Sequence, residues 1–219
     1  MFRPDLVPDK VKLFMVLQPS EEAISQPYYH YLALAASAIT SLTFFGETVN
    51  DTNLQTTNLV VAGAFVTNPK RYAIEGIGLD IIPGVNPSQT ETASGFLNTF
   101  INDLWKIASV GSFVLKLIDT DVLSMAPLYS LPGGVGLDVK AAASAYTLAS
   151  AADRSATIAY GTNGMPSLHG FRWFKAPLPM QKNTTVKGTI NWPTAPSLSA
   201  AAKVGARSEG VEYRPAVGG

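Results

Sequence analysis

The sequence contains no cysteine. This excludes disulfide frameworks, thiol catalysis and cysteine-based zinc sites, and it is compatible with a reducing compartment. Charged residues are also scarce: they make up 15% of 219 residues, and 16 basic residues balance 16 acidic ones. A strongly basic nucleic-acid binder is therefore not expected. Nothing in this charge balance holds copies of the chain apart at long range, which favours self-association.

Histidine is nearly absent, since the chain has only His30 and His169. They form no HxH, HxD or HExxH spacing, so the histidine cluster of metal-binding cupins and dioxygenases is not expected. We interpret His30 as a residue on a tyrosine-rich helix face and His169 as a loop residue. Gly133, Gly134 and Gly136 lack the Lys-Ser/Thr of a phosphate loop and are interpreted as a turn. No metal and no cofactor is predicted.

Carboxylates offer two weak candidate sites. Asp119 and Asp121 are spaced to share a strand face, as the paired acids of a glycosidase would. Oxygen ligands for Ca²⁺ could come from a second segment, which contains Glu47, Asn50, Asp51 and Asn53. Asp and Asn favour turns because their side chains bond their own backbone. We therefore interpret both clusters as turns, and we predict no catalytic residue and no enzymatic activity.

Basic residues occur in pairs and form no stripe. The segment 172–175 (RWFK) interleaves cations and aromatics, as a platform for single-stranded nucleic acid would. It also alternates as an ordinary strand does, and we interpret it as a strand with Trp173 directed inward. No specific nucleic-acid site is predicted.

Short apolar runs, divided by 18 Gly and 15 Pro, predict an all-β sandwich or barrel. The clearest alternation covers residues 184–192 and predicts that Val186, Ile190 and Trp192 are buried. Residues 77–81 alternate in the same way, with Ile77, Leu79 and Ile81 toward the core. Further strands are expected at 41–45, 59–66, 113–117, 125–131, 156–160, 171–174 and 210–214. About nine strands result, close to the eight of a jelly roll.

Helices are expected in two places. Ser20, Glu21 and Glu22 have the pattern of a helix N-terminus, and residues 28–39 are rich in helix formers. Residues 28–45 are the most membrane-like stretch, but they are too polar for a spanning helix. The second helix, 96–106, is amphipathic, with Leu104 and Trp105 on its apolar face and Asp103 on its polar face. Its apolar face is expected to lie on its own domain or on a partner.

Two domains of unequal size follow from these assignments. Residues 1–40 are predicted to form an N-terminal arm and helix, and residues 41–219 a jelly roll with inserted short helices. No secretion signal is expected at the N-terminus. The proline-flanked residues 1–20 cannot bury much surface on their own, so we expect part of them to lie against a neighbouring subunit. Residues 141–152 and 197–206 are rich in alanine and are interpreted as a mobile loop, a short helix or a close-packed contact surface.

Five stretches together resemble one family. They are LTFFGETVNDTN (42–53), FVTNPKRYAIEGIGLDIIPG (65–84), PLYSLPGGVGL (127–137), GTNGMPSLHGFRWFKAPLPMQKNTTVKGTINWP (161–193) and GVEYRP (210–215). In this order they resemble the jelly-roll capsid proteins of small tailless icosahedral bacteriophages, including the lipid-containing ones. The stretches contain 82 of the 219 residues, somewhat more than a third of the chain. The chain departs from the double-barrel members of this group, which need about twice as many strands.

The resemblance implies a structural virion protein that self-assembles into capsomers of an icosahedral capsid. It implies a homo-oligomer, contacts with other capsid proteins, an internal lipid membrane as a further candidate partner, and a location in the virion after assembly in the host cytoplasm. Two other hypotheses stay open at this point. One is a carbohydrate-binding β-sandwich, a receptor-binding or lectin-like module that uses surface Tyr and Trp. The other is a β-sandwich glycosidase that uses Asp119 and Asp121.

Overall fold

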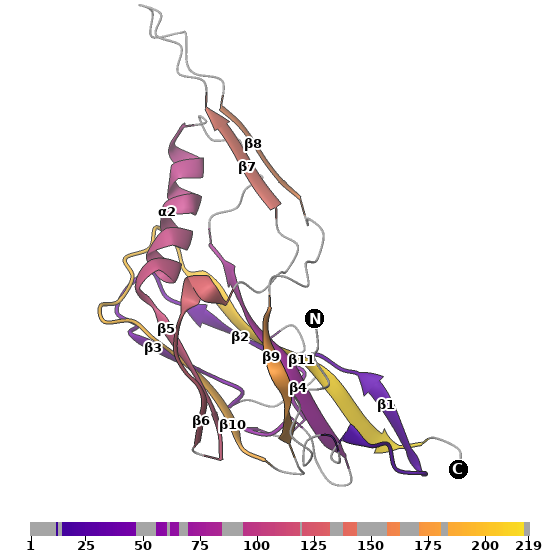
Figure 1. Cartoon of the computed structure of the whole chain (residues 1–219). Helices are drawn as coiled ribbons and strands as arrows, with labels where there is room; N and C mark the ends of the chain where they lie inside the picture. The colour runs from indigo at the N-terminus through magenta and orange to yellow at the C-terminus, as the bar shows by residue number, and fades with distance from the viewer. Residues whose placement is uncertain are drawn as a thin grey trace, which may run out of the picture.

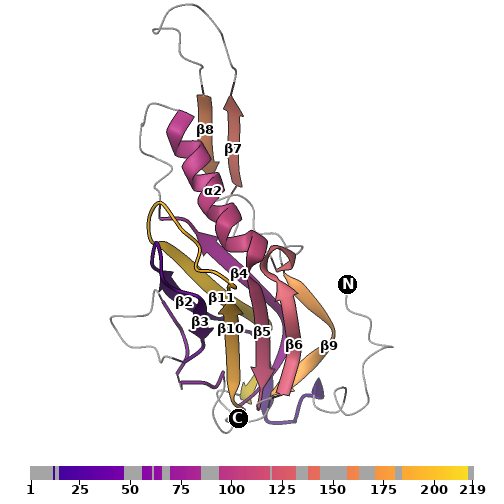
Figure 2. The same cartoon turned by 90° about the vertical axis from the view of Figure 1, so that its left-hand side faces the viewer.

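Two antiparallel sheets, packed face to face, form the body of the computed structural model (Figure 1). The structure describes residues 12, 15–46, 56–60, 62–65, 70–84, 94–118, 120–131, 138–143, 157–162, 171–180 and 184–216. Figure 2 views the same molecule after a quarter turn and shows one sheet in front of the other.

Sheet A is organised around the long central strand β11. Its strands are β1 (Glu21–Ser25), β2 (Tyr28–Leu34), β4 (Arg71–Ile82), β9 (Arg172–Met180) and β11 (Ala202–Pro215). The order is β1-β11-β4-β9, and β2 also pairs with β11. Since β1 pairs with residues 211–215 and β2 with residues 202–208 of that strand, they occupy successive parts of one edge. Sheet A is therefore four strands wide.

Sheet B contains β3 (Ser41–Phe44), β5 (Ser112–Leu117), β6 (Thr120–Pro127) and β10 (Val186–Asn191), in the order β3-β10-β5-β6. Counted along the chain from β2 and without the hairpin β7–β8, sheet A has the order first, eighth, third, sixth. Sheet B has the order second, seventh, fourth, fifth. This strand order is that of a jelly roll, in which eight antiparallel strands form two sheets. The predicted fold class is confirmed.

Further elements are inserted between the strands of the jelly roll. Helix α2 (Ser94–Val110) connects β4 to β5, and the short 3₁₀ helix η2 (Leu128–Ser130) follows β6. The two-stranded hairpin of β7 (Asp138–Ala143) and β8 (Thr157–Thr162) lies between β6 and β9 in the chain. Figures 1 and 2 both show α2 and this hairpin at the same end of the sandwich. None of the helices in the described ranges has the length and apolarity to cross a membrane.

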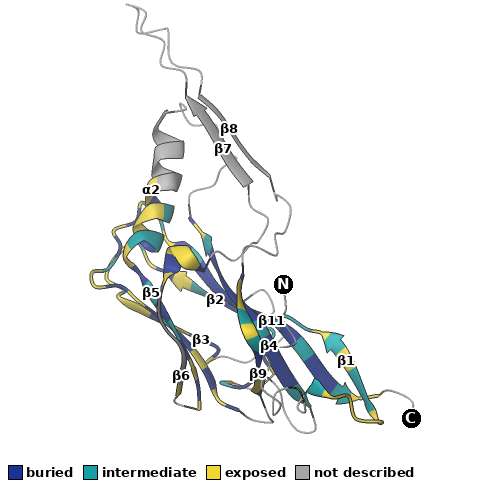
Figure 3. Cartoon of the chain, in the orientation of Figure 1, coloured by how far each residue is buried: buried dark blue, intermediate teal, exposed yellow. Residues whose placement is uncertain are grey.

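The core lies between the inner faces of the two sheets, where Figure 3 shows the buried residues. Ile77 and Leu79 of β4 are buried, as are Val186 and Ile190 of β10 and the following Trp192, as the alternation predicts. Ile81 is half-buried and packs against the same core. Side chains at successive positions point to opposite faces, so each strand contributes one face to this core.

The helix predicted over residues 28–39 is wrong. Tyr28–Leu34 is strand β2, with Tyr28, His30 and Leu34 buried and the residues between them more exposed. The acidic residues interpreted as a helix start belong to strand β1. Pairing with β11 outweighs the helix propensity of Leu and Ala here, because tertiary context overrides local preference. The division into 1–40 and 41–219 stays a prediction, although β1 and β2 belong to sheet A.

Other expected elements differ in their bounds. The strand predicted over 125–131 ends at Pro127, where η2 begins, and the described part of 59–66 contains only an isolated bridge from Ala64 to Thr185. The strand predicted over 210–214 extends back to Ala202 and takes up much of the alanine-rich window 197–206. The predicted helix 96–106 is confirmed within α2.

Candidate interaction surfaces

His30 is a structural residue of the core, although it lies on a strand and not on a helix. It is 1% exposed, and its Nδ1 accepts a hydrogen bond of 2.7 Å from the backbone N–H of Phe45. Phe45 has a φ of 68°, a left-handed conformation that is uncommon outside glycine. The imidazole therefore stabilises the turn that follows β3.

The carboxylate candidates are only partly within the described residues. Asp121 lies in β6, in register with Lys116 of β5. Among the residues that the structure describes, no group of three His, Asp or Glu could hold a metal ion. The other predicted candidates lie outside the described residues; they are Glu47, Asn50, Asp51, Asn53, Asp119, Gly133, Gly134, Gly136 and His169.

Trp173 points away from the core, so its predicted inward orientation is wrong. Its ring lies over Gly76 of β4, 3.0 Å from where a β-carbon on that glycine would be. Phe174 is the residue of this segment that packs against the core. Gly76 leaves a flat site on the outer face of sheet A, which accommodates the larger indole ring. Trp173 remains 38% exposed there.

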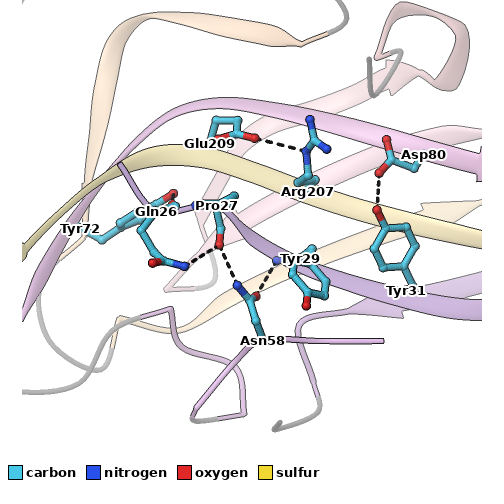
Figure 4. Close-up of polar contacts among 9 residues, drawn as sticks. All are labelled: Gln26, Pro27, Tyr29, Tyr31, Asn58, Tyr72, Asp80, Arg207 and Glu209. Carbon is cyan, nitrogen blue, oxygen red and sulfur yellow. Dashed lines mark hydrogen bonds and ion pairs between the residues drawn. The ribbon is translucent and has the colours of Figure 1, made fainter. Parts of the chain in front are cut away.

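A tyrosine, a glycine and an aspartate form one row across the outer face of sheet A. Tyr31 of β2, Gly205 of β11 and Asp80 of β4 are in register. The Tyr31 hydroxyl donates a hydrogen bond of 2.6 Å to Asp80 Oδ2, as Figure 4 shows. A β-carbon at Gly205 would lie 2.2 Å from the Tyr31 ring. Only a glycine at this position lets the ring lie flat and reach the carboxylate.

Arg207 is the central cation of the same face. Its Nε lies 3.3 Å from Glu209 Oε1, and its guanidinium lies 4.6 Å from the centre of the Phe171 ring. Glu209 is in register with Gly76, the glycine under Trp173. Large side chains therefore lie flat over glycines across β4, β9 and β11, and the outer face of sheet A is an ordered layer of aromatic and charged groups.

Three carboxyl groups of this face are held in an unfavourable environment. Burial raises the pKa of Asp80, an effect that the Tyr31 hydrogen bond and the charge of Arg207 oppose. Burial also raises the pKa of Glu75 and of Glu209. Asp80 is 1% exposed, and its Oδ1 has no hydrogen-bond partner among the described residues. Burial therefore disfavours the charged form of all three carboxyl groups, although Arg207 and Lys203 lie on the same face.

The outer face of sheet B carries different side chains. Lys116 of β5 and Lys187 of β10 are directly opposite each other and exposed. The neighbouring positions on this face are short, with Thr189 of β10 in register with Thr43 of β3. Two like charges directly opposite each other on a sheet are destabilising, but Lys116 is also in register with Asp121 of β6, a residue of opposite charge.

The third surface is the end of the sandwich at which α2 lies. Asp103 is fully buried, and it accepts hydrogen bonds from the backbone N–H of Ser199 at 2.9 Å and from its hydroxyl at 3.3 Å. The prediction that Asp103 lies on the polar face of the helix is therefore wrong. Ile107 is also buried, and its carbonyl accepts a hydrogen bond of 2.9 Å from Trp192 Nε1.

Because Asp103 and Ile107 hold one side of α2 against the sandwich, other residues of the helix point outward. Trp105 is 70% exposed, and Tyr129 of the adjacent η2 is 68% exposed. Val110, at the end of α2, is also exposed. The apolar face of this helix was expected to lie on its own domain or on a partner. Trp105 does not lie on its own domain, because its side chain is exposed.

The alanine-rich windows are only partly surface. Ala202 and Ala206 are buried in the core from β11, which contradicts a contact surface at these two positions, whereas Ala201 is exposed. Ala141–Ala143 lies in β7. Residues 144–152 lie outside the described residues.

Sequence reasoning did not assign a role to the acids on the outer face of sheet A. The signal was the segment EGIGLD (75–80), in which Gly76, Gly78 and Asp80 alternate with Ile77 and Leu79 and so share the opposite face. The rows that these residues form with Tyr31 and Trp173 depend on long-range strand pairing.

Comparisons with known proteins do not assign this chain to a family. No family model matches the chain, and no curated protein matches it. The crystal structure of the 60-mer BFDV capsid protein is similar with a TM-score of 0.29 and 9% sequence identity, over 90% of this chain and 96% of that chain. A match with this TM-score carries no inference about function.

Proposed function

We propose that this chain is a structural virion protein, a subunit of an icosahedral phage capsid that self-assembles into capsomers. Its partners are further copies of itself, other capsid proteins and, as a candidate, an internal lipid membrane. Its location is the virion, after assembly in the host cytoplasm. It acts through contacts between subunits and not through a catalytic residue.

The exposed aromatic pair Trp105 and Tyr129 is the observation that carries this proposal. Tyr and Trp are enriched at protein interfaces and dominate binding energy where they are desolvated. Exposed positions of this size on one end of a subunit leave apolar area that contact with a neighbour would remove from water.

The supports of this pair are rigid, which favours an interface over a flexible surface. Asp103 and Ile107 fasten α2 to the sandwich. A β-carbon at Gly111 would lie 2.4 Å from Leu128 of η2, so the end of α2 and η2 are in close contact. A rigid aromatic surface loses little conformational entropy on binding.

Sedimentation velocity and electron microscopy of the purified protein test this function. The unmodified chain is expected to form capsomers or particles, and Trp105→Ala is expected to weaken this assembly without changing thermal unfolding. Asn102→Ala, at an exposed position of the same helix, is the matched control and should assemble normally. A protein that sediments as a monomer at every concentration and salt, with no particles in micrographs, would contradict the proposal.

A carbohydrate-binding module is the second candidate. The observation in its favour is the exposed Trp173 ring, which lies over Gly76, the residue in register with Glu209. Aromatic faces stack on sugar rings, and carboxylates accept hydrogen bonds from hydroxyl groups. Glycan binding that disappears in Trp173→Ala, in a chain that stays monomeric, would favour this candidate over the capsid subunit.

A further inference from the structure

The two edges of sheet A are built differently. Strand β9 forms one edge and contains Lys175, Pro177 and Pro179, residue types that natural proteins place on edge strands to prevent pairing with another chain. Strand β1 lies at the other edge, beside the C-terminal part of β11 (Figure 1). Its sequence, EEAIS, contains neither proline nor lysine. Among the strands that the structure describes, none pairs with the outer edge of β1.

Two residues of β1 direct their backbone groups away from the sheet. The N–H of Gln26, just after β1, donates a hydrogen bond of 3.1 Å to the carbonyl of Gly210. Hydrogen-bonded positions alternate along an antiparallel pair, so the even-numbered residues of β1 bond to β11. The N–H and C=O groups of Ala23 and Ser25 therefore point outward, and both residues are exposed.

The charges of β1 are paired within the subunit. Arg71 donates a hydrogen bond of 2.6 Å from its Nη2 to Glu21 Oε2, and Arg214 donates one of 2.6 Å from its Nε to Glu22 Oε1. A partner strand is therefore not required to neutralise these carboxylates. A second copy of β1, which carries the same two ion pairs, brings no unpaired charge to the edge.

Apolar side chains flank the same edge. Ile24 of β1 is half-buried, and Val16 and Leu17, which precede β1, are 53% and 49% exposed. The Val16 carbonyl accepts a hydrogen bond of 2.6 Å from Arg71, the arginine that also binds Glu21. These apolar residues therefore lie near β1, where contact with a neighbour would remove them from water.

We propose that β1 of one copy of this chain pairs with β1 of a second copy, antiparallel and about a two-fold axis, so that sheet A continues from one subunit into the next. This contact rests on the proposed self-assembly and names one of its interfaces. The same edge serves both partners, and such an isologous contact closes at two copies. A strand of five residues is smaller than a standard interface, so the contact adds to the one at α2 and does not replace it.

Hydrogen bonding sets the register of this pairing. The N–H of Glu21 already donates to the carbonyl of Gln18 at 2.9 Å, so Ala23 and Ser25 carry the N–H groups that another strand can bind. Both are used when Ala23 of one copy lies opposite Ser25 of the other, because residues opposed in this way exchange both of their hydrogen bonds. Ile24 then lies opposite Ile24 of the second copy, and no glutamate faces a glutamate.

The absence of cysteine from the chain allows a direct test. In a mixture of Ala23→Cys and Ser25→Cys, the two thiols should lie on opposed residues whose Cα atoms are about 5.5 Å apart, within the range of a disulfide. Mild oxidation under assembly conditions should give a linked dimer that contains both variants, in higher yield than either variant alone. Ala201→Cys, exposed just before β11, is the control and should not link to Ser25→Cys.

A proline variant tests the same contact without a thiol. Ala23→Pro removes an N–H that β11 does not use, and edge strands tolerate proline at such positions, so the subunit should fold. Its self-association in sedimentation velocity should weaken roughly tenfold, the effect of a lost hydrogen bond. Ala23→Thr keeps the N–H and should assemble as the unmodified chain does. Circular dichroism and thermal unfolding show that each variant is folded.

Three outcomes would overturn the proposal, and they are distinguishable. If the unmodified chain assembles but the cysteine mixture links no better than either variant alone, β1 is not this interface and the proposed function stands. If Ala23→Cys alone links as well as the mixture, the strands pair in another register and the stated contact is wrong. If the unmodified chain is monomeric at every concentration, both the contact and the proposed function fail.

Discussion

Sheet A and sheet B share one core, but their outer faces are built in different ways. On sheet A, large side chains lie over glycines of neighbouring strands, as Tyr31 lies over Gly205 and Trp173 over Gly76. On sheet B, Thr43 and Thr189 leave the strands thinly covered, and Lys116 and Lys187 stand opposite each other. The first face is ordered by rings that lie over glycines, whereas on the second face Lys116 is in register with Lys187 on one side and with Asp121 on the other.

Each strand of a jelly roll therefore meets two separate requirements, one at its inward positions and one at its outward positions. The inward positions of both sheets satisfy the same requirement, which is to fill a dry core. The outward positions are free to differ, and here they give the molecule a polarity from one sheet to the other. A subunit with two unlike faces can associate head to tail, whereas two identical faces would favour closed pairs.

The largest expected effects come from the inward positions, where the two sheets should be equivalent. Ile77 of sheet A and Leu115 of sheet B are fully buried. Ile77→Ala and Leu115→Ala should each lower the free energy of unfolding by about 2–5 kcal/mol, through lost burial and the cavity left behind. Urea unfolding followed by circular dichroism measures both values. A cost confined to one sheet would show that the two inner faces do not form one core.

Substitutions at outward positions should lower the free energy of unfolding more in sheet A than in sheet B. In Gly205→Ala the added β-carbon would lie 2.2 Å from the Tyr31 ring, so the ring must move and its hydrogen bond to Asp80 is lost. We expect a cost of about 1–3 kcal/mol, typical of overpacking. Thr189→Ala, at a half-buried outward position of sheet B, should change stability by about 0.5 kcal/mol or less. Equal effects in urea unfolding would contradict the proposed difference.

The inward pattern was predictable from sequence because it is local. Alternation alone identified the buried residues of β4 and β10. The same alternation was present in β2, where Tyr28 and His30 face inward, but the leucines and alanines that follow suggested a helix. Tyrosine favours strands because it packs on a pleated surface, and the pairing with β11 that decides the matter is distant in sequence.

The candidate surfaces were less predictable because they depend on partners far along the chain. Asp103 looks like a solvent-facing residue until the backbone N–H of Ser199 is placed against it. That contact sets the rotation of α2 and so turns Trp105 outward. Likewise, nothing local in β4 shows that Asp80 lies beneath a tyrosine of β2. Residues that serve a long-range contact break the local pattern, and there sequence reasoning fails.

A smaller effect should appear as a dependence on pH. The pKa of Asp80 is raised by burial, so its contribution to stability is fully present below the pKa of the unfolded chain and is lost as pH rises through the folded pKa. Asp80→Asn removes this loss. The unfolding free energy of the variant, relative to the unmodified chain, should therefore rise as pH increases from acid to neutral.

Glu21 of β1 provides the control with the opposite sign. Its hydrogen bond with Arg71 lowers the pKa of Glu21, so its contribution is present above the unfolded pKa and is lost as pH falls through the folded pKa. Relative to the unmodified chain, Glu21→Gln should lose stability as pH rises. Urea unfolding across this pH range measures both differences. A relative stability of Asp80→Asn that falls with rising pH would show that this carboxylate is favourably placed.

The smallest effect on folding is expected on the outer face of sheet B. Lys187→Thr removes one of two like charges that lie in register across β5 and β10 and introduces a residue with a higher strand preference. Lys116 keeps Asp121 in register on its other side, so the variant should be more stable by about 0.2–1 kcal/mol, the range of a cross-strand pair. Thermal unfolding measures this difference. Lys175→Thr, at an exposed position of β9, makes the same substitution away from Lys116 and should leave stability unchanged. A Lys187→Thr variant that is less stable than the unmodified chain would show that the lysine pair does not destabilise the folded subunit.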